Sequence, residues 1–276
     1  MIDMLTILLI SLLAGFLGSL TGLGGGSIMI PVLTSFDVPV KYAIAASMVT
    51  IIATSSGSAA SYVRERITNV KAAFYLEMFT ITGAIIGATI TSYIAPRFLY
   101  FFFAGFLLTS FYGLSGHLRE DIPKPVKQDR FSRWLQLRGS YYDQAAKKQI
   151  DYEMTNAGIG GLGMMVAGLA AGMLGIGAGA FKVSIHELIL KMPSKVSSTT
   201  SNFIIGITAL AGASVYFASG LLYLGLAAPM AVGTTIGALA GGRILNRFRN
   251  RMIRYMFLAV VIVLIIQMIY KGIIST

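Results

Sequence analysis

Eight long apolar segments, separated by shorter polar stretches, make up most of the chain. A helix that crosses the roughly 30 Å hydrocarbon layer of a bilayer needs about 20 mostly apolar residues, and the segments approach that length. The pattern therefore predicts a helical protein that crosses a membrane several times. The segments lie at about 5–20, 42–62, 72–95 and 98–114, and again at about 157–174, 197–217, 221–239 and 252–269.

Composition supports this prediction. Hydrophobic residues make up 55% of the chain and charged residues only 12%, whereas soluble domains carry about 25% charged residues. The formal net charge of +11 comes from residues in the loops, where it sets membrane orientation. No basic face interleaved with aromatic residues is present, so we expect no nucleic-acid partner. The first apolar segment has no basic residue ahead of it and no cleavage site, and we expect it to be a retained span.

A Gly-rich interruption follows the first apolar segment on each side of a polar linker. The first reads GFLGSLTGLGGGSIMIPVL (15–33) and the second GLAAGMLGIGAGAFKVSIH (168–186). A series of further matches in the same order indicates an internal duplication. We predict a first transmembrane repeat at 1–116, a linker at 117–154 and a second transmembrane repeat at 155–276. The further matches are Pro39 and Lys41 with Pro193 and Lys195, Gly83 and Gly87 with Gly233 and Gly237, and Arg97 with Arg247.

The distribution of Lys and Arg distinguishes parallel from inverted repeats. If each Gly-rich interruption merely ended a full span, the repeats would be parallel and the two faces would hold twelve and nine basic residues. If the chain turns back after the interruption, the repeats are inverted and the faces hold eighteen and three, with Lys182 left out. Because Lys and Arg accumulate on the cytoplasmic side, we predict inverted repeats with both termini outside and a cytoplasmic linker.

The expected fold class is an all-α membrane protein with two inverted repeats, each with about four spanning helices and a Gly-broken re-entrant or short helix. The linker is the strongly polar part of the chain. Phe131, Trp134, Leu135 and Leu137 lie among arginines there, which is compatible with a short amphipathic helix at the membrane surface. A solvated connector explains the pattern equally well.

The two Gly-rich interruptions are the candidate binding site. Breaking a helix inside hydrocarbon is costly unless the freed backbone lines a cavity or is buried in protein. The short helices that follow present N–H groups and the positive end of the helix dipole, which attract anions. Tight helix packing is the alternative explanation for a Gly-rich run. The residues expected to face the ligand are Gly24, Gly25, Gly26 and Ser27 in the first break, and Gly177, Gly179 and Ala180 in the second.

Hydroxyl and amide side chains begin the spans that follow the two breaks. Ser47 and Thr50 lie in the first repeat, and Thr200, Ser201 and Asn202 lie in the second. Facing a cavity, these groups could donate hydrogen bonds to the oxygens of an anion. Helix capping and hydrogen bonding between helices are the alternative roles.

Lys182 is the most informative charged residue, because an ionisable group inside a membrane segment usually marks a functional site. It follows Gly179 by three residues and could supply a counter-charge to an anion, although a lysine can also extend its ammonium toward the membrane surface. His186 and Glu187 are expected nearer water, with Glu187 a candidate for proton coupling. Glu77 is expected to be an exposed carboxylate near a cytoplasmic helix end.

The sequence gives little support for an enzyme active site or a metal site. The two histidines lie in different segments, and no cysteine is present, so we expect no metal cluster, no catalytic triad and no cofactor. The GLGGG run lacks the Gly-Lys-Ser/Thr ending and the preceding strand of a nucleotide-binding loop. We expect no enzyme activity.

With its paired GLGGGSIMIPVL and GIGAGAFKVS segments and the later STTSNFIIGITA run, the chain resembles the TauE/SafE sulfite exporter family. The resemblance covers both halves and is weakest in the linker. It implies a cell-membrane carrier of small sulfur-containing anions such as sulfite, sulfonates and sulfoacetate, often an exporter. Carried over, residues 22–27, 175–180 and 200–202 together with Lys182 would line the site. Ala178 and Ser184 depart from the family pattern, which usually has Gly and Pro there.

Two other functions remain open at this point. One is a carrier of another small solute, such as a carboxylate or a metal cation, and the other is a membrane sensor or assembly factor that transports nothing. The sequence leaves the direction of transport, the energy coupling and the possibility of a homodimer undecided. Expected partners are a small anionic substrate and the lipid bilayer.

Overall fold

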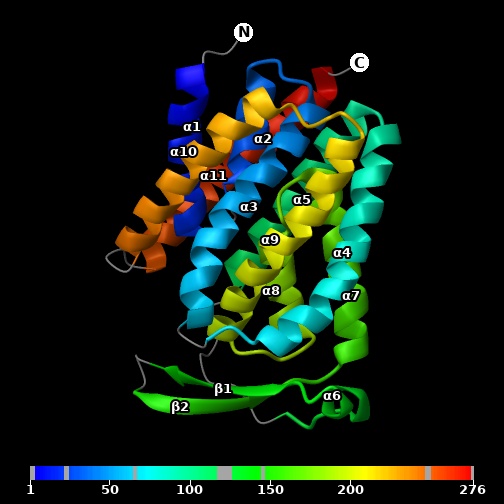
Figure 1. The fold of residues 1–276 in the computed structure, drawn as a ribbon, viewed down its shortest axis with the longest axis vertical. Helices are drawn as coiled ribbons and strands as arrows, with labels where there is room; N and C mark the ends of the chain where they lie inside the picture. The colour runs from blue at the N-terminus through cyan, green and yellow to red at the C-terminus, as the bar shows by residue number, and fades with distance from the viewer. Residues whose placement is uncertain are drawn as a thin grey trace.

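The computed structural model of the protein is mostly helical and describes residues 4–21, 25–64, 67–116, 126–143, 147–245 and 250–274. The first half comprises α1 (Met4–Thr21), α2 (Gly26–Ser35), α3 (Val40–Arg64), α4 (Val70–Tyr93) and α5 (Pro96–Gly116). The linker contains α6 (Arg130–Trp134), β1 (Arg138–Asp143) and β2 (Lys148–Glu153). The second half comprises α7 (Ala157–Leu174), α8 (Gly179–Leu188), α9 (Ser194–Ala218), α10 (Leu224–Leu245) and α11 (Asn250–Ile274) (Figure 1).

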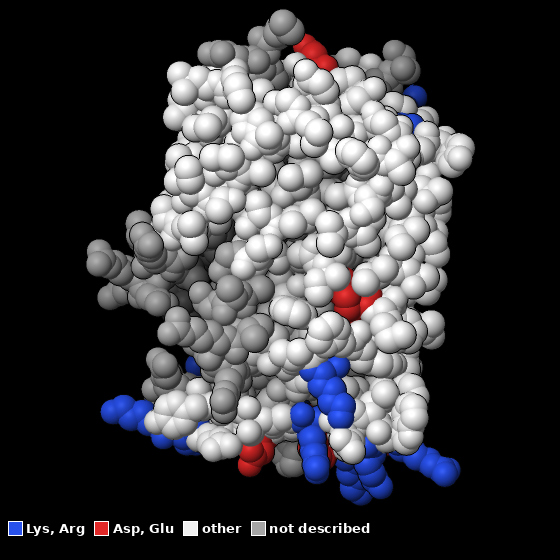
Figure 2. All heavy atoms as spheres, viewed as in Figure 1, with Lys and Arg blue, Asp and Glu red and all other residues white. Residues whose placement is uncertain are grey.

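The outer surface of the helical body is apolar, as a lipid environment requires. Leu9, Val166, Leu210 and Ile266 are each more than half exposed, and Figure 2 shows a nearly uncharged surface between the two ends of the molecule. Shorter apolar helices accompany the longer ones, and the prediction of a multi-pass membrane protein is confirmed. Among the described residues, four stretches are long and apolar enough to cross a membrane: Val70–Tyr93, Ala157–Leu174, Lys195–Ala218 and Leu224–Gly241.

The long helices pair mainly with helices of the other half. α1 packs along α10, α4 along α7, α3 along α9 and α5 along α11. Glycines allow the paired backbones to approach closely, as is common in membrane helices. A Cβ atom at Gly83 in α4 would lie 2.1 Å from the carbonyl oxygen of Met165 in α7. One at Gly237 in α10 would lie 2.0 Å from that of Leu12 in α1.

A β-hairpin lies beneath the helical body, at the end opposite both termini (Figure 1). β1 and β2 are antiparallel, with Arg138 opposite Glu153 and Asp143 opposite Lys148. The prediction of an all-α chain was therefore incomplete. Ile150 and Tyr152 are buried while their neighbours in β2 are exposed. This short alternation of buried and exposed residues is typical of a strand, and the prediction of an all-α chain did not take it into account.

The linker packs against the helical body and is not a detached connector. Leu137 and Tyr152 belong to a buried cluster that also contains Leu76 of α4 and Ala157 of α7. The short helix, one of the two interpretations of the linker, corresponds to α6, whose Trp134 is 74% exposed. The linker thus shares a core with α4 of the first half and with the second half.

Asp129 connects the linker to the start of α7 through hydrogen bonds to its carboxylate. One carboxylate oxygen accepts a hydrogen bond from the backbone N–H of Asn156 (2.8 Å), and the other accepts one from the backbone N–H of Ser132 (3.2 Å). Burial alone would raise the pKa of Asp129, but hydrogen bonds from Ser132, Asn156 and Thr155 outweigh it and hold the pKa below its ordinary value. A carboxylate with a lowered folded-state pKa stabilises the fold at neutral pH and loses this contribution as the pH falls through that pKa.

Candidate functional site

The second Gly-rich break is a short, left-handed stretch between α7 and α8. Gly175 ends α7 with φ 64°, Gly177 has φ 70°, and Ala178 precedes α8 with φ 51°. A positive φ is easily adopted by Gly and strained for most other residues. Ala178 therefore has a conformation that glycine would adopt at lower cost.

The first break ends at Gly25 and leads into α2, and both breaks meet the middle of α3. A Cβ atom at Gly26 would lie 2.7 Å from the side chain of Ile51, and one at Gly177 would lie 3.6 Å from it. A Cβ atom at Gly175 would lie 2.6 Å from the hydroxyl of Ser47. The structure thus brings Gly26, Gly177 and Ser47 together from separate parts of the chain, whereas the predicted residue Gly24 lies outside the described residues.

The predicted hydroxyl groups are buried and hydrogen-bonded to the protein in this conformation. The hydroxyl of Ser47 lies 2.7 Å from the carbonyl oxygen of Gly175, and that of Thr50 donates to the carbonyl oxygen of Ser47. Ser201 donates to the carbonyl oxygen of Gly179 (3.3 Å), and Thr200 accepts from the backbone N–H of Asn69. Ser27 is also buried, whereas Asn202 is only partly buried. These hydroxyls therefore join the breaks to α3 and α9.

A buried cluster of charged and hydroxyl groups lies one turn into α8. Lys182 is fully buried, and its ammonium donates a hydrogen bond to the hydroxyl of Thr208 on α9 (2.8 Å). That hydroxyl lies 3.0 Å and 3.2 Å from the two carboxylate oxygens of Glu77 on α4. Thr80, also on α4, donates to Glu77 (2.8 Å). Three helices thus contribute to a cluster in which one hydroxyl group bridges the buried Lys182 and Glu77, and the ammonium does not extend to the membrane surface.

The expectation that Glu77 is exposed was wrong, since its side chain is only 3% exposed. The cause is the packing of α4 between α7 and α9, which turns Glu77 inward. The rule that identified Lys182 applies equally here, because Glu77 also lies within an apolar segment. Thr80 and Thr208 were missed as well, although Thr208 follows the predicted residue Ser201 by two helical turns and shares its face.

His186 lies one turn after Lys182 on the same face of α8. It is fully buried, so the expectation that it lies near water was wrong. Its Nδ1 lies 3.4 Å from the carbonyl oxygen of Ser197, while its Nε2 has no hydrogen-bond partner among the described residues. Glu187, the next residue, is partly buried. Its proposed coupling role stays a prediction.

A cavity lies at the end of the molecule near the termini, and none of the residues of the charged cluster lines it. That cavity, of about 760 Å³, has a mainly apolar lining that includes Phe36, Tyr42 and Tyr223, and Asp37 is its charged residue. None of its lining residues is a predicted site residue. Within the described part of the chain, no group of three or more His, Asp or Glu residues could hold a metal ion.

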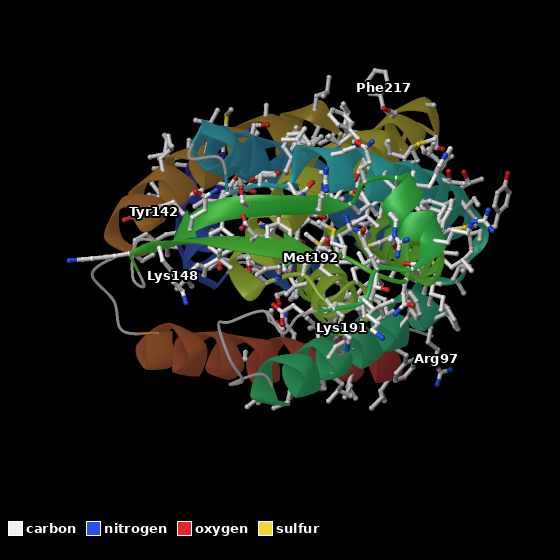
Figure 3. All side chains as sticks on the ribbon, turned by 90° about the horizontal axis from the view of Figure 1, so that it is seen from below. Arg97, Tyr142, Lys148, Lys191, Met192 and Phe217 are labelled. Atoms are coloured by element: carbon white, nitrogen blue, oxygen red, sulfur yellow. The ribbon has the colours of Figure 1, made fainter. Side chains whose placement is uncertain are left out.

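The opposite end of the molecule is covered by the linker. Seen from below, the hairpin crosses the helical body beside Lys191 and Met192, in the connection between α8 and α9 (Figure 3). The backbone N–H of Thr155 donates to the carbonyl oxygen of Leu190 in that connection (3.2 Å). Asn69 links the hairpin to α9, because its side chain donates to the Tyr152 hydroxyl (3.0 Å) while its backbone N–H donates to Thr200.

Comparison with known proteins identifies related membrane proteins. A family model described as sulfite exporter TauE/SafE matches residues 7–268. The chain is 26% identical over 277 residues to the probable membrane transporter protein YunE of Bacillus subtilis (strain 168), with 98% of each chain covered. It is 27% identical over 250 residues to the probable membrane transporter protein YdhB of the same organism, with 89% of this chain and 90% of the relative covered. No solved structure matches the chain.

Proposed function

Because the chain belongs to the sulfite exporter TauE/SafE family, we propose that it carries a small sulfur-containing anion outward across the cytoplasmic membrane by alternating access. Sulfite, sulfonates and sulfoacetate are the proposed substrates. Family membership makes the chain a membrane transporter and not an enzyme. The choice of substrate and the outward direction are the parts that we propose.

The buried ammonium of Lys182 is the observation that carries the proposal. A lysine inside a membrane protein is costly unless it serves a ligand or pairs with another charge. Within the described residues, the ammonium makes one hydrogen bond, to Thr208, although an ammonium has three N–H donors. The unused donors suit a ligand with several oxygen acceptors, as sulfite and sulfonate groups have. The first turn of α8, which begins at Gly179, adds the positive end of a helix dipole close by.

The rest of the proposed site surrounds the meeting point of the two breaks. Gly25, Gly26 and Ser27 would contribute from the first break, and Gly177, Gly179 and Ala180 from the second. Ser47, Thr50, Thr200, Ser201 and Asn202 would line the path between them. In the described conformation most of these hydroxyls bond to backbone groups, so we propose that a change in helix pairing frees them to bind the anion.

We propose that the two halves are inverted repeats, and the helix contacts support this. Exchanging α1–α5 for α7–α11 in order turns the α1–α10 pair into the α7–α4 pair. The same exchange maps the α3–α9 and α5–α11 pairs onto themselves. Two related halves that contact each other through matching surfaces would produce this pattern.

The close contacts at glycines follow the same exchange of helices and support a specific alignment of the two halves. Gly15 in α1 approaches the carbonyl oxygen of Thr234, and Gly172 in α7 approaches that of Ala84. Thr234 and Ala84 occupy equivalent positions when Gly233 is matched with Gly83. Gly15 therefore corresponds to Gly172 in the second half. The aligned sequence segments instead match Gly15 with Gly168, about one helical turn earlier in the chain. α1 continues for six residues after Gly15, whereas α7 continues for two residues after Gly172, which accounts for the difference.

We propose that both termini face outward and that the linker is cytoplasmic. Both termini lie at one end of the molecule and the hairpin lies at the other (Figure 1). Lys and Arg gather at the hairpin end in Figure 2. An excess of these residues is typical of the cytoplasmic side of a membrane protein.

Exchange of labelled anions in proteoliposomes tests the proposed function. Vesicles containing the purified protein and loaded with sulfite, methanesulfonate or sulfoacetate should accumulate the labelled anion by counterflow, and vesicles without protein should not. Lactate serves as the matched carboxylate control and is expected to exchange much more slowly. Faster exchange of lactate than of every sulfur anion would indicate a carboxylate carrier. Exchange of none of them would indicate a membrane protein that does not transport these solutes.

A further inference from the structure

We propose that Glu77 is a proton-binding site of the transport cycle, and that its carboxylate and the transported anion compete for the ammonium of Lys182. This inference rests on the function proposed above and adds the movement of a proton with the anion. One proton would move with each monovalent anion, in the same direction.

Side chains from three different helices meet at this site. Glu77 comes from α4, Lys182 from α8 and Thr208 from α9, and the Thr208 hydroxyl stands between the two charges. All three side chains are at most 3% exposed. Movement of α8 relative to α4 would therefore separate the two groups, so their contact through Thr208 is sensitive to the helix packing that alternating access must change.

Charge balance links the proton to the anion. Without substrate, the carboxylate of Glu77 neutralises the ammonium of Lys182. If an anion bound to Lys182 while Glu77 stayed ionised, the buried site would carry an uncompensated negative charge, which is strongly unfavourable in a medium of low dielectric constant. Addition of one proton to the carboxylate removes that charge. The proton enters from the side from which the anion comes, and it leaves Glu77 when the anion is released.

Few other titratable side chains on the neighbouring helices could bind the proton in place of Glu77. His186 is the other buried titratable group near Lys182, and α7 carries none. The remaining titratable groups on packed helices have partners elsewhere: Lys41 donates to the carbonyl oxygen of Ser92, Lys71 to Gln136, Tyr75 to the carbonyl oxygen of Ala157 and Tyr216 to that of Gly172. The other titratable side chains described on α3, α4, α5, α8 and α9 are Tyr42, Tyr93, Arg97, Tyr100, Glu187 and Lys195.

The cluster has no charged equivalent in the other half. With the helix starts at Gly26 and Gly179 matched, Met29 occupies the place of Lys182 and is fully buried. With Gly83 and Gly233 matched, Ala227 occupies the place of Glu77. One such cluster among the described residues supports a ratio of one proton to one anion.

Proton movement during anion flux tests the inference. Methanesulfonate is the probe, because it stays ionised at neutral pH and carries no proton itself. Wild-type proteoliposomes with a pH-sensitive dye inside should take up about one proton per anion, as neutralisation of one buried carboxylate requires. Glu77→Gln, which mimics the protonated acid, should keep anion exchange. It should lose the accompanying proton movement and slow net uptake by about tenfold or more, because the empty carrier then holds an unpaired ammonium.

Matched variants distinguish Glu77 from other residues that could bind the proton. His186→Gln should leave the proton ratio unchanged, Glu187→Gln tests the other candidate carboxylate, and Glu77→Asp should keep proton movement because a carboxylate remains. Anion flux without protons in the wild type would overturn the coupling while leaving the proposed function intact, and this result does not depend on whether any variant folds. An unchanged proton ratio in a folded Glu77→Gln protein, or loss of protons in Glu187→Gln instead, would overturn the role of Glu77. Flux of none of the sulfur anions would overturn the proposed function and this inference with it.

Discussion

Replacing Lys182 by methionine should reduce transport of sulfur anions by about 100-fold or more, because truncating one partner of a buried charge pair costs several kcal/mol. Methionine has nearly the volume of lysine, so the change removes the ammonium while keeping the space between α8 and α9 filled. Initial rates of anion counterflow in proteoliposomes measure the effect. Loss of the ammonium leaves Glu77 and Thr208 without their cationic partner, but Glu77 can take up a proton and become neutral.

Lys148→Met is the matched control for this experiment. Lys148 is an exposed residue at the start of β2, so its substitution removes the same charge far from the buried cluster and should leave transport unchanged. Both variants should elute as monodisperse protein, which separates loss of transport from loss of folding. Equal rates for the two variants would contradict an anion site at Lys182.

Replacing Gly83 by alanine should destabilise the protein by about 3 kcal/mol or more, because overpacking against a backbone cannot be relieved by a side-chain rotation. The added Cβ would lie 2.1 Å from the carbonyl oxygen of Met165 and 2.7 Å from the backbone nitrogen of Leu169. α4 and α7 would have to separate, and α4 carries Glu77. Thermal unfolding in detergent and the yield of monodisperse protein measure the effect.

Gly105→Ala in α5 provides the control, since a Cβ there would have no atom within 4 Å. Alanine favours an α-helix over glycine by about 1 kcal/mol, so this variant should be as stable as the wild type or slightly more stable. If the two variants melted at the same temperature, the close contact between α4 and α7 would be contradicted.

Much of the helical architecture could be predicted from the hydrophobic pattern. The apolar segment at 72–95 corresponds to α4 (Val70–Tyr93), and the short helix expected after the second break corresponds to α8 (Gly179–Leu188). A long apolar run in a chain with few charges has few alternatives to a membrane helix. The β-hairpin escaped prediction because its alternation spans only a few residues in a polar linker, where the hydrophobic signal is weak.

The candidate site was predicted only in part. Lys182 stood out because it is an ionisable residue in an apolar segment, three residues after Gly179, and the structure places it in a buried cluster. Glu77 was misplaced because both faces of a membrane helix are apolar, one toward lipid and one toward protein, so hydropathy does not tell which way a residue points. Only the packing of α4 between α7 and α9 decides that Glu77 faces Thr208. The left-handed conformation of Ala178 was likewise hidden, since alanine rarely adopts it.

The most direct test of the central claim asks whether the two broken helices enter the membrane from opposite sides. The chain has no cysteine, so a single introduced cysteine is the only thiol available to a maleimide. Phe36 follows α2 and Lys195 lies at the start of α9, and both are exposed. With a membrane-impermeant maleimide on intact cells, Phe36→Cys should be labelled directly, whereas Lys195→Cys should be labelled only after the membrane is opened. Labelling of both cysteines from the same side would contradict the inverted arrangement and the anion site built on it.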